Sequence, residues 1–318
     1  MSGDHSTSHI IQSLMVNLII AVGKGIAALM TGSGSMLAET LHSFADCGNQ
    51  LLLLLGVRKS RHAPTAAHPL GFGRALYFWS FMVALLLFSG GGLFSIYESI
   101  HKLRHPEPVG DMRLALTILA LSLLLEGWAT YKNVLELNVR RKGRPFFRFL
   151  SDSKDSDLVV VFGENAAAVL GLSIALIAIG LAAWTGDGSW DAIGSLFIGV
   201  VLIGVAIFLA IEVKSLIIGE AADPEIEEAV RVTVAEDTHI IGLLRLITVQ
   251  QGPGEVVVAM KVSFVTTLTA VEVSRAINDF EDRLRARCPE VRWSFIEPDM
   301  PRSTPRPSAP DHSTALRA

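Results

Sequence analysis

The sequence predicts an α-helical membrane protein with six transmembrane helices and a C-terminal cytoplasmic α+β domain. Two observations lead to this fold class. Hydrophobic residues make up 50% of the 318 residues, and the mean hydropathy of +0.45 exceeds the values that are usual for soluble domains. The apolar residues also gather in long runs before Gly219, whereas amphipathic and alternating patterns follow it.

Six segments are apolar over the roughly 20 residues that a membrane-spanning helix needs. Ionisable side chains interrupt the first two, with Lys24 in the first and Glu39, His42 and Asp46 in the second. The predicted spans cover residues 9–31, 35–57, 75–99, 112–134, 158–184 and 190–217.

The charges of the loops predict the orientation of these spans. Lysine and arginine concentrate between the second and third spans and between the fourth and fifth, whereas the loop between the first two spans carries neither. The positive-inside rule therefore places the basic loops and both termini in the cytoplasm. The short N-terminus, MSGDHSTSHI, shows no leader or transit pattern, which favours the cell inner (plasma) membrane of a bacterium over an organelle membrane.

The region after Gly219 predicts a two-layer module with the ferredoxin-like order αββαβ. Asp223 and Pro224 are typical of the start of a helix, and Thr269 with Glu272 has the spacing of a capping box at the start of a second. The strands are predicted in LLRLITVQ, EVVVAMKVSF and VRWSFIE, with the turn QGPG between the first two.

Glu39, His42 and Asp46 fall on one face of the second span, because a helix turns by about 100° per residue. Ionisable groups inside a bilayer are costly unless they are paired or functional. His42 and Asp46 are four residues apart, so an imidazole nitrogen and a carboxylate oxygen can reach one cation such as Zn²⁺. The alternative is a cluster of interhelical hydrogen bonds without a metal.

The fifth span offers Glu164 and Asn165 near its start, followed by small residues that let another helix approach. Packing this span against the second would complete a metal site with His42 and Asp46. The alternative for Glu164 is a carboxylate that stabilises the helix N-terminus. Among the other polar residues, Lys24 suits an ion pair or a position at the membrane surface, and Glu126 suits a proton carrier or a pairing role.

Four segments, in this order, resemble the cation diffusion facilitator family, the zinc-transporter or solute-carrier-30 type. The resemblance is strongest to the branch of the animal mitochondrial zinc transporter, and it extends from about residue 8 to 299. The segments are GSGSMLAETLHSFADCGNQLLLLLG, HPLGFGRALYFWSF, FSIYESIHKL and WDAIGSLFIGVVLIGVAIFLAIEVKSLIIGEAADP.

The resemblance implies a homodimer in the lipid bilayer that exports a divalent cation, Zn²⁺ first, in exchange for protons by alternating access. The family's transport site takes two ligands from each of the second and fifth helices, and His42 and Asp46 match the first pair. The second pair would fall near Val161 and Asn165, so the expected histidine and aspartate are absent here and Glu164 is the substitute. This departure leaves Mn²⁺, Fe²⁺, Co²⁺ and Ni²⁺ open.

The predicted site therefore has His42, Asp46, Glu164 and Asn165 as ligands and His42 and Asp46 as proton carriers. Glu39 and Asn49 support these ligands or line the way in. The cation is substrate rather than cofactor, and neither an enzyme nor a nucleic-acid partner is expected at a net charge of -4. The rival functions are a metal sensor or scaffold without flux, an exporter of organic cations, and an intramembrane hydrolase.

These predictions divide the chain into four regions. We expect a short cytoplasmic N-terminus at 1–8, a transmembrane cation-transport domain at 9–219, a cytoplasmic dimerisation domain at 220–299 and a disordered tail at 300–318. His239 is the only histidine between Gly219 and Met300, so we expect no binuclear zinc site in the cytoplasmic domain.

Overall fold

The computed structural model describes residues 3–60, 62–105, 112–141, 143–154 and 156–301. The chain divides into two compact units. The first extends up to Glu220 and also takes Gln251–Pro253, and the second consists of Ala221–Gln250 and the residues from Gly254 onwards. Most of the predicted disordered tail, from residue 302, lies outside the described residues.

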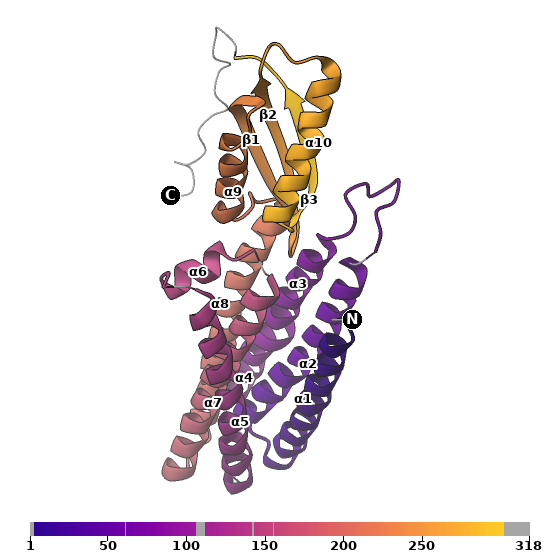
Figure 1. Ribbon diagram of the computed structural model, residues 1–318. Coiled ribbons are helices and arrows are strands. Elements are labelled where there is room, and N and C mark those ends of the chain that lie inside the picture. Colours follow the sequence, from indigo (N-terminus) through magenta and orange to yellow (C-terminus); the bar gives the residue numbers. More distant parts are fainter. Residues whose placement is uncertain (1–2, 61, 106–111, 142, 155, 302–318) are drawn as a thin grey trace. The chain divides into compact units, whose positions relative to one another are not determined.

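Long helices running side by side make up the first unit (Figure 1). The central helix is α2, which packs against α1, α3, α7 and α8, while α5 packs against α1 and α7. The helices are α1 (Gly3–Thr31), α2 (Gly34–Ser60), α3 (Ala75–Leu86), the π-helix η1 (Leu87–Leu93), α4 (Phe94–Arg104), α5 (Met112–Arg140), α6 (Phe146–Asp152), α7 (Ser156–Thr185) and α8 (Ser189–Ile218).

Among the described residues, four helical segments are long and apolar enough to cross a membrane, by length and composition. They are Ala75–Arg104, Met112–Arg140, Leu158–Thr185 and Ser189–Ile218, and Asn17–Thr31 is a shorter apolar helix. The chain therefore has a helical domain of membrane type. The six predicted spans are not all confirmed, because among the described residues α2 is not one of these four segments and α1 enters only with Asn17–Thr31.

The segment Ala75–Arg104 contains a π-helical turn, η1, that the sequence did not predict. It lies over the glycines of LFSGGGL, and one of them allows a close approach to α8. A Cβ atom on Gly92 would lie 2.5 Å from Cγ1 of Ile203, and one on Gly199 would lie 2.7 Å from Cγ1 of Ile96. Glycine is needed at both positions because the backbone of each helix lies directly against an isoleucine side chain of the other.

The second unit is a three-stranded sheet with two helices. The elements are α9 (Pro224–Ala235), β1 (Ile240–Gly252), β2 (Glu255–Phe264), α10 (Ala270–Arg287) and β3 (Val291–Pro298). The strand order is β1-β2-β3, and β3 runs parallel to β2. The turn between β1 and β2 ends in Gly254, whose φ of +67° favours glycine.

Local signals in the second unit are confirmed. The Asp223 side chain accepts from the backbone N–H of Glu225 at the start of α9. Thr269 and Glu272 form the predicted capping box at the start of α10. Alternate β2 residues, among them Val258 and Met260, pack in one core with residues of both helices.

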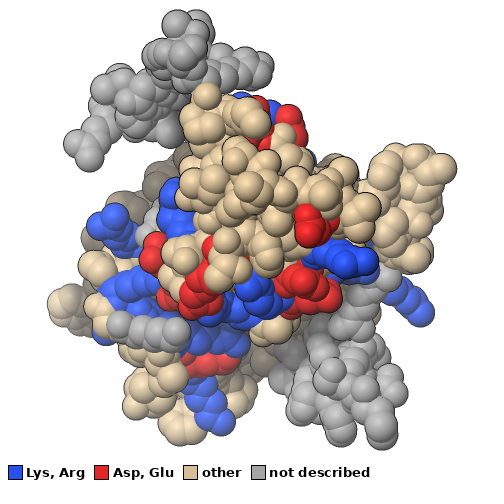
Figure 2. Space-filling view, turned by 45° about the horizontal axis from the view of Figure 1, so that its top comes forward, with Lys and Arg blue, Asp and Glu red and all other residues tan. Residues whose placement is uncertain are grey.

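The face of the molecule drawn in Figure 2 carries charged side chains of both signs, which lie interspersed rather than as a field of one sign. In the second unit, exposed ion pairs such as Arg287–Glu236, at 2.8 Å, join charges of opposite sign. Pairs of this kind add little stability, because water and salt screen them.

Candidate metal-transport site

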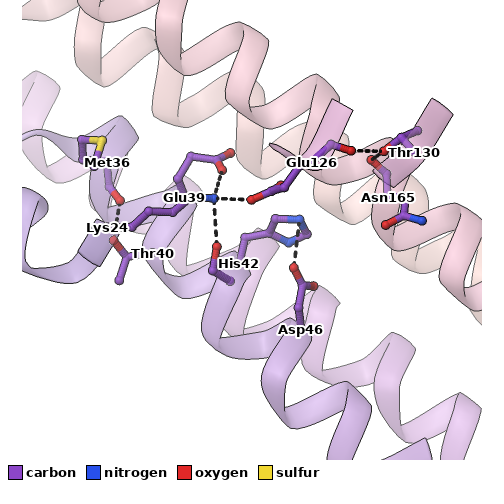
Figure 3. Close-up of polar contacts among 10 residues, drawn as sticks. Lys24, Met36, Glu39, Thr40, His42, Asp46, Glu126, Thr130 and Asn165 are labelled. Atoms are coloured by element: carbon purple, nitrogen blue, oxygen red, sulfur yellow. Dashed lines mark hydrogen bonds and ion pairs between the residues drawn. The ribbon is translucent and has the colours of Figure 1, made fainter. Parts of the chain in front are cut away.

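Helix α2 places His42 and Asp46 one turn apart, on the face that looks toward α5 and α7 (Figure 3). The His42 side chain is 1% exposed and that of Asp46 is 19% exposed. The distance from His42 Nε2 to Asp46 Oδ2 is 3.7 Å, which is too long for a hydrogen bond. The two groups are therefore neighbours that do not satisfy one another.

Both residues present buried polar atoms without a hydrogen-bond partner in the part of the chain that the structure describes. These atoms are Nδ1 and Nε2 of His42 and Oδ1 of Asp46. A buried polar atom without a partner costs roughly 1–3 kcal/mol. Such atoms are expected where a ligand supplies the missing contacts.

A cavity of about 530 Å³ opens beside Asp46. Carboxylates and amides from several helices line it together with apolar side chains. Its lining is Asn17, Ile20, Ser43, Asp46, Gln50, Val57, Glu126, Ala129, Lys132, Asn133, Glu136, Val161, Glu164, Asn165 and Ala168.

Helix α7 contributes Glu164 and Asn165 to this cavity. Oε1 of Glu164 accepts a hydrogen bond from Nδ2 of Asn49 on α2, at 2.6 Å. Asn165 receives a contact at its backbone oxygen, from Oγ1 of Thr130 at 3.5 Å. Buried Ala167 follows on α7, and a small residue there lets α7 lie close to α2.

A buried ion-pair network lies next to the cavity. Nζ of Lys24, on α1, donates to Oε2 of Glu39 at 3.3 Å, to Oγ of Ser43 at 2.9 Å and to Oε1 of Glu126 at 3.0 Å. The side chains of Lys24 and Glu39 are both 0% exposed. Of the two roles considered for Lys24, an ion pair or a position at the membrane surface, the structure shows the ion pair. Of the two considered for Glu126, a proton carrier or a partner of another charged group, it shows the partner role.

The predicted site residues come together in part. Asp46, Glu164 and Asn165 line one cavity and His42 adjoins Asp46, whereas Glu39 binds Lys24 and Asn49 binds Glu164. Among the described residues, no three histidine, cysteine, aspartate or glutamate side chains are grouped closely enough to hold one metal ion. The arrangement is thus an open set of polar side chains around a cavity.

Asp191 is a residue of structural importance that the sequence analysis missed. It lies near the start of α8, is 1% exposed, and its carboxylate accepts from Oγ of Ser33 at 2.7 Å and from the backbone N–H of Ser35 at 3.1 Å. It thereby caps α2, the helix of the site. The signal that was available is an acidic residue inside the first turn of a long apolar helix.

Comparison with known proteins gives one family match and several relatives. The family model "Cation efflux transmembrane domain" matches residues 10–218. The chain is 33% identical to "Proton-coupled zinc antiporter SLC30A9, mitochondrial" of Homo sapiens over 289 residues, which are 89% of this chain and 51% of that protein. It is 37% identical to the protein of the same name in Xenopus laevis over 218 residues, 68% of this chain and 39% of that one.

A bacterial relative matches at lower identity. The chain is 29% identical to "Cation-efflux pump FieF" of Escherichia fergusonii over 253 residues, 78% of this chain and 77% of the pump. It spans about half the length, 51%, of the human relative.

The expected location in a cell inner (plasma) membrane is wrong. The animal relatives are named mitochondrial proteins, and their names point to a mitochondrial membrane instead. The expectation rested on the absence of a transit pattern in MSGDHSTSHI, and the absence of a local pattern does not identify a membrane.

Proposed function

This chain belongs to the cation efflux family, and from that premise we propose that it exports Zn²⁺ across a membrane in exchange for protons. The family match over residues 10–218 confirms the predicted resemblance to cation diffusion facilitators. The printed names of the relatives, a proton-coupled zinc antiporter and a cation-efflux pump, support the proposed substrate and coupling. On this proposal the metal is the transported substrate, and the chain is a secondary transporter rather than an enzyme.

One observation carries the proposal: the unpaired, buried atoms of His42 and Asp46 adjoin a cavity that Glu164 and Asn165 also line. An imidazole nitrogen, two carboxylates and an amide oxygen suit a borderline divalent cation. We propose these four residues as the ligands. A small movement of α7 against α2 would bring them around one ion.

The proposed coupling follows from the chemistry of the same ligands. A metal ion needs a neutral His42 and an ionised Asp46, so binding displaces any protons that these groups carry. An imidazole exchanges protons near neutral pH. In alternating access, the two residues hold the cation when the cavity opens to one side and carry protons when it opens to the other.

We also propose that α1 and α2 cross the membrane, which gives six spans with residues 9–219 as the transport domain. The charges that lower their apolar character are buried among helices: Lys24 pairs with Glu39, and His42 lies beside Asp46. A charged side chain at membrane depth is tolerated when it faces the bundle interior and is paired.

For the second unit we propose a ferredoxin-like dimerisation domain at 220–299 and a homodimer. The helices α9 and α10 share a core with one set of alternate β2 residues. On the opposite face, Ile247 is 43% exposed and Phe295 is 56% exposed, and both line a groove with Ala259. Arg245, Lys261 and Glu297 also line this groove, and exposed apolar side chains beside charged ones suit a contact with a second copy of the chain.

The test of transport uses the full chain in sealed vesicles with a pH gradient and a panel of divalent metals. We expect Zn²⁺ flux driven by the gradient, and its loss in His42→Ala and in Asp46→Ala. Saturable Zn²⁺ binding without flux would contradict the proposal and favour a metal sensor or scaffold.

The choice of α7 ligands is tested in the same vesicles. We expect Glu164→Ala to reduce Zn²⁺ flux and Asn165→Asp to strengthen the preference for Zn²⁺ over Mn²⁺, because it restores a carboxylate. If Asn165→Asp has this effect while Glu164→Ala leaves flux unchanged, Glu164 is not a ligand.

A further inference from the structure

The ammonium group of Lys24 lies in a shell of oxygen atoms that resembles a cation site (Figure 3). Three oxygens surround Nζ, from Ser43 at 2.9 Å, Glu126 at 3.0 Å and Glu39 at 3.3 Å. Two helices, α2 and α5, supply these oxygens, and the cation comes from a third, α1. The site is therefore built between helices and is filled by a side chain.

The two carboxylates of this shell have further binding capacity. Oε1 of Glu39 and Oε2 of Glu126 are buried without a hydrogen-bond partner among the described residues. Two carboxylates against one ammonium leave a formal charge of about -1, and a buried charge is costly unless it is matched. The single positive charge of Lys24 therefore balances only one of the two carboxylates of the shell.

The shell is also continuous with the proposed transport site. Glu126 and Ser43 line the same cavity as Asp46, and Ser43 directly follows His42 on α2. A divalent cation that reaches Asp46 is therefore next to a second set of oxygen ligands. Hard divalent cations such as Mn²⁺ prefer carboxylate and hydroxyl oxygens, which is what this set offers.

We propose that Lys24 is a tethered cation that fills a second cation site, formed by Glu39, Ser43 and Glu126, and so restricts the cavity to one divalent ion at a time. The inference rests on the proposed transport function and adds a specificity-determining residue to it. The Lys24 ammonium, which carries one positive charge and is attached to the chain, occupies the place between these oxygens. A second metal ion would have to displace this ammonium group in order to bind there.

The test counts bound ions in the purified full chain. Mn²⁺ binding is measured from the electron paramagnetic resonance signal of the free ion, for the wild type, Lys24→Gln and Lys24→Arg. We expect Lys24→Gln to bind one more Mn²⁺ per chain than the wild type, because it leaves the buried carboxylate of Glu39 and the partly buried one of Glu126 without their cation. Lys24→Arg keeps the charge and is expected to bind no additional ion.

Two double variants locate the additional ion. It is expected to disappear in Lys24→Gln/Glu126→Gln, which removes one carboxylate of the shell, and to persist in Lys24→Gln/His42→Ala, which removes a ligand of the transport site. If Lys24→Gln binds the same number of ions as the wild type, the proposal is wrong. It is also wrong if the additional ion is lost with His42 rather than with Glu126.

A stability measurement covers the case in which Lys24→Gln folds poorly. The variant is purified in millimolar Mn²⁺, and its thermal midpoint is expected to rise with Mn²⁺ more than that of the wild type. Failure to recover folded protein even in Mn²⁺ contradicts the proposal, because the ion should replace the lost ammonium. The transport proposal fails on a different observation, namely the absence of Zn²⁺ flux in the wild type, and the number of bound ions does not affect that result.

Discussion

Among single residues, Asn49 has the clearest supporting role at the proposed site. It is 0% exposed, and its Nδ2 holds Oε1 of Glu164 at 2.6 Å across the contact between α2 and α7. A residue that orients a metal ligand in this way typically changes affinity by about 10–100-fold when it is removed.

We therefore expect Asn49→Leu to raise the KM for Zn²⁺ by about tenfold and to change the maximal rate less. The measurement is the initial rate of Zn²⁺ uptake into vesicles over a range of concentrations. Leu51→Ala, at a 48% exposed position of the same helix, serves as the control and should leave the KM unchanged. An unchanged KM in Asn49→Leu would show that Glu164 needs no support from this amide.

Helical periodicity was enough to predict that Glu39, His42 and Asp46 share a stripe, because all three lie within two turns of one helix. It could not pair Lys24 with Glu126, which are 102 residues apart in the sequence. Such a pairing depends on how α1 and α5 pack. The sequence shows the cost of a buried charge but not which residue offsets it.

At the scale of the helices, close packing of α7 against the site depends on Gly171. A Cβ atom there would lie 2.3 Å from Oε1 of Glu39, whereas one on Gly180 of the same helix would have no atom within 4 Å. Glu39 is held by Lys24, so its carboxylate has little freedom to move aside.

We expect Gly171→Ala to lower the free energy of unfolding by about 1–3 kcal/mol, because the added methyl group overpacks the contact and displaces Glu39 from Lys24. Gly180→Ala is the matched control, and it should be neutral or stabilise the helix by up to about 1 kcal/mol. Thermal midpoints in detergent, measured for both variants, check this. Equal midpoints would mean that α7 and Glu39 adjust without cost.

The start of α2 depends on hydrogen bonds to Asp191 of α8. Its carboxylate accepts from Ser33 and from the backbone N–H groups of Gly34 and Ser35, which an isolated helix would leave without partners. Asp191→Ala is expected to lower the free energy of unfolding by about 1–3 kcal/mol, since hydrogen bonds to a charged group are lost. Thermal midpoints again give the measurement.

Asp187→Ala is the control for Asp191→Ala. Asp187 is an exposed acid just before the start of α8, and its Oδ1 accepts from the backbone N–H of Ser189 at 2.9 Å. That hydrogen bond lowers the pKa of the Asp187 carboxyl but connects no second helix. If the two variants destabilise equally, the contact between α8 and α2 does not stabilise the bundle.

The helix starts show which parts of the fold the sequence can predict. Asp223 and Thr269 cap their own helices, and both were predicted because cap and helix lie within four residues. Asp191 caps a helix that starts 157 residues earlier, so its position in the first turn of α8 singles it out but does not reveal which helix it caps. The π-helical turn over Leu87–Leu93 was missed for a similar reason, since it accompanies close packing on α8.

For the whole molecule, the sequence predicted the order of helices and strands after Gly219, because strand alternation and helix-capping patterns are properties of consecutive residues. The membrane in which the protein resides was predicted wrongly, as the mitochondrial names of the animal relatives show. That prediction rested on the N-terminal pattern MSGDHSTSHI, whereas the loop charges served only to orient the spans, so neither observation identified the membrane.

The proposed homodimer is tested at the sheet face opposite α9 and α10. Ala259 of β2 lies in register with Phe295 of β3, and Phe295 is 56% exposed. We expect Phe295→Asp to convert the dimer to a monomer, because burying a carboxylate in an apolar contact is costly while the exposed position leaves folding intact.

Size-exclusion chromatography with light scattering of the full chain in detergent gives the mass. Val271→Asp, at a 60% exposed position on α10, is the matched control and should stay dimeric. A Phe295→Asp variant that remains dimeric would show that the two copies meet elsewhere. Retained Zn²⁺ flux in a monomeric Phe295→Asp variant would further show that each chain transports by itself, since the proposed ligands all come from one bundle.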